Sequence, residues 1–266
     1  MLKDNGTDMI QKTLHHGKCH ICGQIKELSY EHVPPRVALN KTTRFVSIPH
    51  EEWTKVDNFL TYKPKGQVLQ GGIGYYSLCR ECNSFLGQKY VKAYKKWIQS
   101  GLEVMANLKE DYFNYIAINQ EPLSILKQII SMFIAINDVW YLTEYPDLVA
   151  FVKDPNSNHL SDKYRVFTYL NNEGQYRYIK HSVLSNTELG VINVTELTFP
   201  PFGYVLTFDV KHDIYPLTNI THFKNYKHGQ VADLDISIFK LPTFLPVFPL
   251  DYRTREKIDK DSKSSM

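Results

Sequence analysis

The sequence predicts an α+β protein, with an N-terminal unit built around a metal site and a C-terminal domain of helices packed on an antiparallel sheet. The first observation is that the four cysteines form two C-x-x-C pairs with none left over, Cys19 with Cys22 and Cys79 with Cys82. The second is helical spacing of apolar residues over 84–108 and 121–137. The third is a series of strand-like segments after residue 164.

Composition excludes two broad classes of protein. The 266 residues suffice for one large domain or two modest ones, and 14 Phe and 18 Tyr supply enough apolar surface to exclude a disordered chain. The longest apolar run, Ile129 to Ile136, is far shorter than the ~20 residues that a membrane span needs. The first thirty residues show no apolar stretch of the kind found in secretory signals. We therefore expect a cytoplasmic protein that does not contact a membrane.

Charge is distributed unevenly along the chain. The formal net charge is only +3, but residues 1–108 hold 15 Lys and Arg against 9 Asp and Glu, while residues 109–266 hold 16 against 19. A basic half suits a polyanionic partner such as nucleic acid. The alternative is that this imbalance is ordinary variation in charge along the chain, and the counts alone do not distinguish the two explanations.

The N-terminal elements follow from turn and strand signals. Residues 1–17 predict a short helix or a loose arm, and residues 18–33 predict a knuckle turn followed by a short strand. Pro34 and Pro35 end that strand, because proline has no N–H to give to a ladder. Residues 36–74 form a long connection, and 75–78 a second short strand that leads into the second cysteine pair.

Two helices and a group of strands complete the expected elements. The helix over 84–108 is expected to break at Gly101, and the helix over 121–137, apolar on nearly all sides, is expected to be buried. Residues 164–170 and 176–180 flank an Asn-Asn-Glu-Gly turn and predict a hairpin. Further strands are predicted at 191–197, 203–209 and 233–239. The predicted organisation is a domain over 1–110, a second over 111–251, and a flexible tail over 252–266.

The two cysteine pairs favour a zinc site over disulfides, because no secretory signal is visible. Four thiolates saturate a tetrahedral zinc ion, so its role would be structural. The 56 residues between the pairs exceed the roughly 15–20 of common zinc ribbons, but loop-closure entropy grows slowly with length. A redox pair and free buried thiols remain as alternatives. His15, His16 and His20 are substitute ligands, although we expect His20 to point away from the site.

Three residues near the cysteines suggest phosphodiester chemistry. Glu31 and His32 follow the first pair, and Asn83 directly follows the last cysteine. A carboxylate and a neutral oxygen donor suit a hard divalent cation, and an imidazole with a pKa near ~6.5 suits a general base acting on water. The alternatives are a Glu-His pair that only decorates the surface and an Asn that only caps a helix.

The motifs CHICG, YEHVPP and SLCRECNSFLG together resemble those of the HNH endonucleases, nucleases of the ββα-metal class. The resemblance covers about residues 18–97 and implies an N-terminal ββα-metal module held by zinc on the four cysteines. It implies that His32 is the general base and that Glu31 and Asn83 bind a catalytic Mg²⁺ or Mn²⁺. Two positions depart from the family pattern. Gly74 stands where the family has an Asn that positions the base, with Asn40, Gln67 and Gln70 as substitutes, and Glu31 stands where Asp is commoner.

The resemblance implies a metal-dependent endonuclease that hydrolyses phosphodiester bonds in DNA, with phage defence or restriction in a bacterium as the context. The expected partner is double-stranded DNA, and the residues expected to contact it are Arg36, Arg80, Lys89, Lys92 and Lys96. The C-terminal domain carries no catalytic motif and is expected to recognise substrate, sense a signal, form a homodimer or bind a partner protein. One alternative is a catalytically inactive zinc-containing nucleic-acid-binding protein, which Gly74 favours. Another is a zinc module in a protein–protein adaptor, which the basic N-terminal half disfavours.

Overall fold

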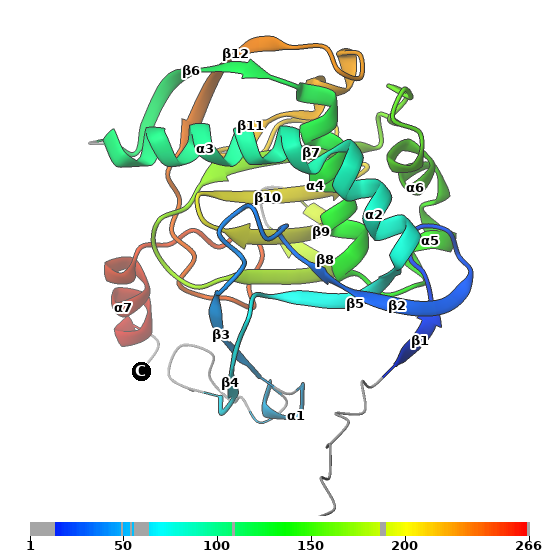
Figure 1. The fold of residues 1–266 in the computed structure, drawn as a ribbon. Helices are drawn as coiled ribbons and strands as arrows, with labels where there is room; N and C mark the ends of the chain where they lie inside the picture. Colours follow the sequence, from blue (N-terminus) through cyan, green and yellow to red (C-terminus); the bar gives the residue numbers. More distant parts are fainter. Residues whose placement is uncertain are drawn as a thin grey trace, which may run out of the picture.

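The computed structural model describes residues 14–48, 50–53, 55, 64–107, 110–186 and 190–264. These residues are arranged around one buried helix, α4 (Pro122–Ile136), which crosses a five-stranded antiparallel sheet (Figure 1). The cysteine-bearing unit lies against this helix, at the bottom of Figure 1. Within the described residues, no helix combines the length and the apolar character that crossing a membrane requires.

Two antiparallel strands followed directly by a helix form the N-terminal unit. Strand β2 (Ile25–His32) pairs with β5 (Gly74–Cys79), and α2 (Arg80–Lys89) begins at the next residue. The predicted end of the first strand before the two prolines is confirmed. A third strand, β1 (His15–Lys18), pairs with the other edge of β2. The prediction of a helix or loose arm is wrong for this strand, because the turn after it folds the chain back onto β2; residues 1–13 lie outside the described part.

The long connection between β2 and β5 contains secondary structure of its own. Strands β3 (Arg44–Ser47) and β4 (Gln67–Gln70) pair antiparallel, and the short helix α1 (His50–Trp53) lies between them in sequence. This arm extends below the small sheet in Figure 1. Its strands are exposed and partly apolar, with Val46 54% and Val68 50% accessible.

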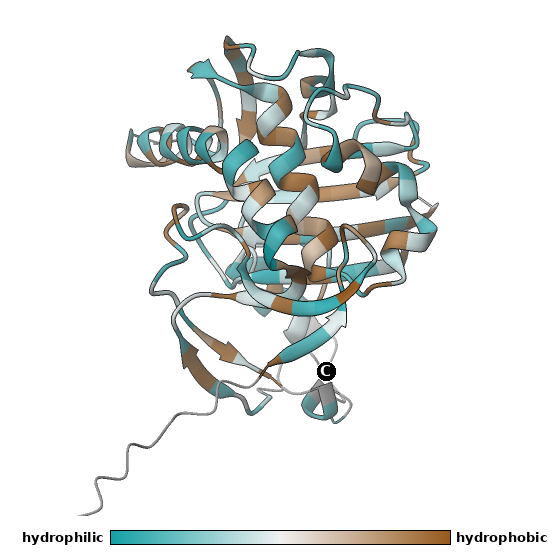
Figure 2. Cartoon of the chain, turned by 45° about the vertical axis from the view of Figure 1, so that its right-hand side comes forward, coloured by the Kyte–Doolittle hydropathy of each residue, from teal (hydrophilic) through white to brown (hydrophobic). Residues whose placement is uncertain are grey.

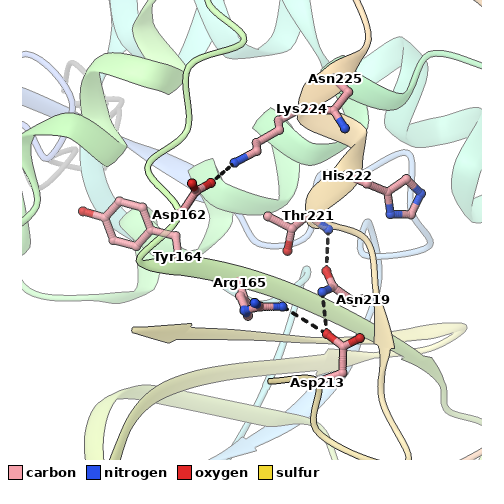
Figure 3. Close-up of a pocket in the computed structure, with 9 residues that line it drawn as sticks. All are labelled: Asp162, Tyr164, Arg165, Asp213, Asn219, Thr221, His222, Lys224 and Asn225. Carbon is pink, nitrogen blue, oxygen red and sulfur yellow. Dashed lines mark hydrogen bonds and ion pairs between the residues drawn. The ribbon is translucent and has the colours of Figure 1, made fainter. Parts of the chain in front are cut away.

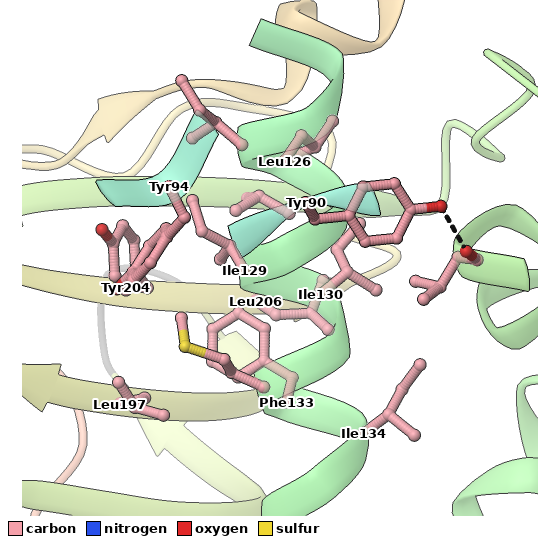
Figure 4. Packing of buried hydrophobic residues seen from close by; sticks show 14 of the residues in the cluster. Tyr90, Tyr94, Leu126, Ile129, Ile130, Phe133, Ile134, Leu197, Tyr204 and Leu206 are labelled. Atoms are coloured by element: carbon pink, nitrogen blue, oxygen red, sulfur yellow. Dashed lines mark hydrogen bonds between the residues drawn. The ribbon is translucent and has the colours of Figure 1, made fainter. Parts of the chain in front are cut away.

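The helix predicted over residues 84–108 is two helices, α2 and α3 (Val91–Asn107), and the break lies at Tyr90 rather than at Gly101. Tyr90 is completely buried, and its hydroxyl donates a hydrogen bond of 2.7 Å to the carbonyl oxygen of Val152 (Figure 4). Gly101 serves a different purpose inside α3. A Cβ there would lie 2.5 Å from the Phe202 ring, so the missing side chain lets the helix approach the sheet closely.

Helix α4 is buried along its whole length, as its apolar residues predict. Figure 4 shows its side chains packed between the α2–α3 region and the sheet, and Figure 2 shows the hydrophobic character of the strands that it crosses. The contacts that carry this core are made by Leu126, Ile129, Ile130 and Phe133 of the helix and by Leu197, Tyr204 and Leu206 of the sheet. One hydrophobic cluster joins residues of both predicted domains, from Cys19 to Ile238. The N-terminal unit is therefore packed onto the same core as the rest of the chain.

The five-stranded sheet has the order β11-β7-β10-β9-β8 and is antiparallel throughout. Its strands are β7 (Tyr164–Leu170), β8 (Arg177–Asn186), β9 (Gly190–Phe199), β10 (Phe202–Phe208) and β11 (Thr218–Asn219). The predicted hairpin between β7 and β8 is wrong, because β7 pairs with β10 and β11, while β8 pairs with β9. Asn171, in the expected turn, instead donates its amide to the carbonyl oxygen of Leu241 at 2.8 Å.

The remaining elements surround this sheet. They are the two-stranded sheet of β6 (Tyr112–Gln120) and β12 (Ala232–Phe239), the helices α5 (Tyr141–Glu144) and α6 (Pro146–Lys153), and the 3-10 turn η1 (Thr221–Asn225). The segment after β12 is held by Arg177, which is completely buried, pairs with Glu196 at 2.8 Å and donates to the carbonyl oxygen of Asp251. Where the sequence predicts a flexible tail, residues Arg255–Ser264 form α7.

A buried lysine joins α4 to α6. Lys127 has no exposed surface, and its ammonium group donates hydrogen bonds to the carbonyl oxygens of Phe151 and Asp154 at the end of α6. Burial lowers the pKa of Lys127 to about 8. The ammonium therefore satisfies carbonyl groups that the end of a helix leaves without partners.

Replacing Lys127 with Met should destabilise the protein by about 2–4 kcal/mol, because two buried carbonyl oxygens would lose their donor. Urea unfolding at pH 7 measures the change. The control is Lys153→Met, since Lys153 is exposed on α6 and a surface change of this kind shifts stability by less than about 0.5 kcal/mol. Equal stabilities of the two variants would contradict the assigned role.

Candidate functional site

The four cysteines come together where the two strands and α2 meet. Cys19 and Cys22 lie in the turn between β1 and β2, Cys79 ends β5, and Cys82 lies in the first turn of α2. Their sulfur atoms all lie within 4.8 Å of one another, and those of Cys22 and Cys79 are 3.9 Å apart. Four thiolates around one ion with ~2.3 Å bonds have sulfurs about 3.8 Å apart. The cluster thus matches the size of a tetrahedral metal site, and the cysteines form no disulfide.

Main-chain N–H groups close the first cysteine turn and donate to one of the sulfur atoms. Gly23 has a φ of 73°, which suits glycine, and its N–H donates to the carbonyl oxygen of Cys19 at 2.9 Å, closing the turn. The N–H of Cys79 points at the Cys19 sulfur, 3.3 Å away. A hydrogen bond from the Cys82 thiol lowers the pKa of Cys19 to about 4, whereas burial raises the pKa of Cys79 to about 11. A metal ion would displace the protons that remain on the cluster.

The nearby histidines take no place among the ligands. His20 points away from the cluster, as predicted, and its Nδ1 lies 3.2 Å from the carbonyl oxygen of Ile134 at the end of α4. His15 stacks on Tyr76 with ring centroids 3.6 Å apart. Within the described part of the chain, the metal-binding group consists of the four cysteines alone.

We expect the purified protein to carry one metal ion per chain, and Cys79→Ser to lose that ion together with thermal stability. Elemental analysis and thermal unfolding measure the two effects. The matched control is Ser77→Ala, two residues earlier in the same strand, because the buried Ser77 hydroxyl has no hydrogen-bond partner in the described part of the chain. Full metal content in Cys79→Ser would refute the four-thiol site.

Glu31 is a buried carboxylate near the end of β2. It pairs with Tyr75 across the ladder, and only 8% of the residue is exposed. Within the described residues the carboxylate has neither a hydrogen bond nor an ion pair, and burial raises the pKa of Glu31 to about 8. A buried carboxylate of this kind is costly unless a proton or a cation accompanies it. Glu31 is therefore available as a ligand for a metal ion.

Asn83 lies on the same side of β2 as Glu31. Its side-chain amide donates a hydrogen bond of 3.0 Å to the hydroxyl of Ser29, and the Ser29 hydroxyl donates to the carbonyl oxygen of Leu78. Ser29 and Glu31 are two residues apart in a strand, so their side chains share one face. The cap of α2 is Cys79, so Asn83 is not the helix cap. Its hydrogen bond uses the amide nitrogen and leaves the oxygen for another ligand.

His32 lies on the opposite face of β2. Its neighbours in sequence, Glu31 and Val33, are both buried, whereas His32 is half-buried and packs edge-on against Tyr30, with ring centroids 5.0 Å apart. Its Nε2 lies 3.0 Å from the carbonyl oxygen of Gly71. The imidazole of His32 therefore lies on the outer face of β2, opposite the Glu31 side chain.

Gly74 has a steric reason to be glycine. It pairs with His32, and a Cβ at this position would lie 2.8 Å from Cε1 of Tyr30 and 2.3 Å from the carbonyl oxygen of Glu31. The Tyr30 ring therefore occupies the space that a side chain at position 74 would need. An Asn does not fit here without displacing it.

Asn40, one of the three substitutes considered for the missing Asn, is completely buried next to His32. Its amide donates to the carbonyl oxygens of Pro34 and Ile73 at 2.8 and 2.7 Å, and its oxygen accepts the N–H of Ile73 at 2.8 Å. These three bonds join the chain after β2 to the chain before β5. Gln67 and Gln70 are exposed on β4 and make no such contact within the described residues.

Asn40→Ala should destabilise the protein by about 2–3 kcal/mol, since the Pro34 carbonyl oxygen and the Ile73 N–H lose the side chain that binds them, while the Ile73 carbonyl oxygen keeps only the N–H of Val33. It should also speed hydrogen exchange at the N–H of Ile73, which mass spectrometry can follow. Asn158→Ala, at an exposed loop position, is the control. An unchanged exchange rate at the Ile73 N–H in Asn40→Ala would show that the Asn40 side chain is not needed to hold the two segments together.

The predicted nucleic-acid contacts are dispersed over the surface. Arg36, Arg80, Lys89 and Lys92 are exposed, and Lys96 is half-buried with its ammonium 3.5 Å from the carbonyl oxygen of Asn119. Within the described residues none of the five pairs with a carboxylate, so all five charges remain available to an anion.

A separate polar cavity of about 570 Å³ lies between β7, β11 and η1 (Figure 3). Sequence spacing gave no signal for it, because its lining comes from segments some sixty residues apart. Its cations are already neutralised, Arg165 by Asp213 at 3.2 Å and Lys224 by Asp162 at 2.6 Å. The cavity offers no free charge to a ligand.

Comparison of the chain with family models, with curated proteins and with solved structures gives no match.

Proposed function

We propose that the protein is a metal-dependent endonuclease of the HNH type, in which the four cysteines hold a structural zinc ion. The observation that carries the proposal is the N-terminal unit: two paired antiparallel strands, β2 and β5, with α2 directly after β5 and a four-thiol cluster where they meet. This order of elements, together with the motifs of the sequence, is the basis for proposing a module of the ββα-metal nuclease type. The catalytic ion would be Mg²⁺ or Mn²⁺, which prefer oxygen ligands.

Glu31 and Asn83 are suited to hold this second ion. Asn83 contacts β2 at Ser29, two residues before Glu31. Glu31 supplies a carboxylate that has no partner among the described residues, and Asn83 supplies an amide oxygen. A divalent cation bound there would stabilise the charge that develops on a phosphodiester during hydrolysis. The surrounding cations, Arg36 and Arg80 among them, would position the nucleic-acid backbone.

His32 is the proposed general base, and its position sets a condition on the mechanism. Because its imidazole lies on the outer face and Glu31 lies on the inner face, the two side chains can act on one phosphate only at the C-terminal end of β2, where His32 is the last residue. Release of Nε2 from the Gly71 carbonyl oxygen is part of that approach. Asn40 fixes the two chain segments on either side of His32 and so takes the positioning role of the missing Asn.

A second candidate function is nucleic-acid binding without cleavage. The separation of His32 from Glu31 across the strand favours it, because a general base and a metal-bound phosphate have to meet. The free cations of the N-terminal unit serve this function equally well. Activity measurements distinguish the two candidates.

Zinc-loaded protein should nick supercoiled plasmid DNA in Mg²⁺, leaving 5′-phosphate and 3′-hydroxyl ends. Glu31→Gln, His32→Ala and Asn83→Ala should each lower the rate at least 100-fold, because each removes a ligand or the base. The control is His212→Ala, at an exposed loop position far from the cysteines in sequence. Cleavage by His32→Ala at the wild-type rate would refute the proposed base. Binding of DNA without cleavage by the wild-type protein would support the second candidate.

A further inference from the structure

Four aromatic rings follow one another across the outer face of the small sheet, away from α4. They are those of His15 on β1, Tyr76 on β5, and Tyr30 and His32 on β2, here called the aromatic row. Successive ring centroids lie 3.6, 5.3 and 5.0 Å apart. Tyr76 is 45% and Tyr30 37% exposed, which is unusual for two adjacent large rings in a sheet. The row ends at the residue proposed as the general base.

The ring of Tyr30 lies along β5 instead of projecting from it. Its hydroxyl donates to the carbonyl oxygen of Gly72 at 2.9 Å, and its Cε1 and Cζ lie 2.8 and 2.9 Å from where a Cβ of Gly74 would be. One side of the ring is therefore packed on a strand that has no side chain at that point. The ring remains 37% exposed, and its hydrogen bond to Gly72 holds that exposed part in place.

The segment that carries three of the four rings has an excess of cations. The described residues 14–48 contain five cations, Lys18, Lys26, Arg36, Lys41 and Arg44. They contain only two carboxylates, and one of these, Glu31, is buried on the other face. Lys26 of this set already pairs with Glu81 at 3.5 Å. Exposed aromatic rings in a segment with an excess of cations are the combination that binds unpaired nucleotides, whose bases stack while their phosphates pair with Lys and Arg.

We propose that the aromatic row binds unpaired bases of single-stranded nucleic acid and so delivers a strand to His32. The inference rests on the nucleic-acid binding in the proposed function and specifies the form of the substrate. A duplex presents phosphates and groove edges, whereas the row offers surfaces for base faces, which a duplex keeps stacked inside. DNA and RNA bases share this chemistry, so the row accepts either and the 2′-hydroxyl is left to other contacts.

Fluorescence anisotropy with a 12-nucleotide single strand, as DNA and as RNA, tests the proposal. The zinc-loaded protein is used in Ca²⁺, which allows binding without cleavage. Tyr30→Leu and Tyr76→Leu should each weaken binding of the single strand about tenfold, the effect of losing one stacked base. Binding of a 12-base-pair duplex should change less than twofold. Tyr30→Phe and Tyr76→Phe, which keep the ring, should bind the single strand nearly as well as the wild type.

The control is Tyr215→Leu, which removes a tyrosine that is 83% exposed outside the small sheet. Equal affinities of Tyr30→Leu, Tyr76→Leu and the wild type for both single strands would overturn the proposal, and so would an equal loss for the duplex. Cleavage in Mg²⁺, measured separately on the single strands and on supercoiled plasmid, keeps the two proposals apart. Cleavage with single-strand binding that does not depend on the rings overturns only the aromatic row, whereas ring-dependent binding without cleavage of any of these substrates supports the row and overturns only the nuclease.

Discussion

The N-terminal unit depends on the closure of the four-thiol cluster. Cys19 and Cys22 precede β2, while Cys79 and Cys82 lie at the junction of β5 and α2, so one ion would join segments that are 56 residues apart in the sequence. Binding free energy of such a site is folding free energy, since the unfolded chain has no preformed site. The position of every other candidate residue follows from this junction. Asn83 lies one residue after the last cysteine, and Glu31 lies on the strand that the same turn begins.

The two faces of the small sheet have different chemistry. The inner face carries the buried carboxylate of Glu31, where the proposed function places a hard cation. The outer face carries the aromatic row, which ends at His32 and is where we propose that unpaired bases bind. Because alternation along β2 places consecutive residues on opposite faces, a single peptide bond separates the proposed metal ligand from the proposed base.

The sequence predicted the parts of the fold that local patterns determine. The end of β2 at the prolines, the buried helix α4 and the cysteine cluster were all readable from spacing. Pairing between distant segments was not: β7 and β8 were expected to form a hairpin, yet each pairs with β9 or β10, because sheet order depends on contacts that no local window contains. Gly101 was read as a helix break for the same reason, since the Phe202 ring that requires it lies a hundred residues away.

The candidate site also depends on contacts between distant segments, which the sequence alone does not show. The motifs of the sequence pointed to Glu31, His32 and Asn83. Only the structure shows that His32 lies on the outer face of β2 and that Asn40 joins the chain after β2 to the chain before β5.

The most direct test is anomalous diffraction from crystals of the zinc-loaded protein soaked in Mn²⁺. We expect a zinc peak among the four sulfurs and a manganese peak between the Glu31 carboxylate and the Asn83 side-chain oxygen. Manganese absent from that position, with the Glu31 carboxylate hydrogen-bonded to the protein instead, would contradict the account.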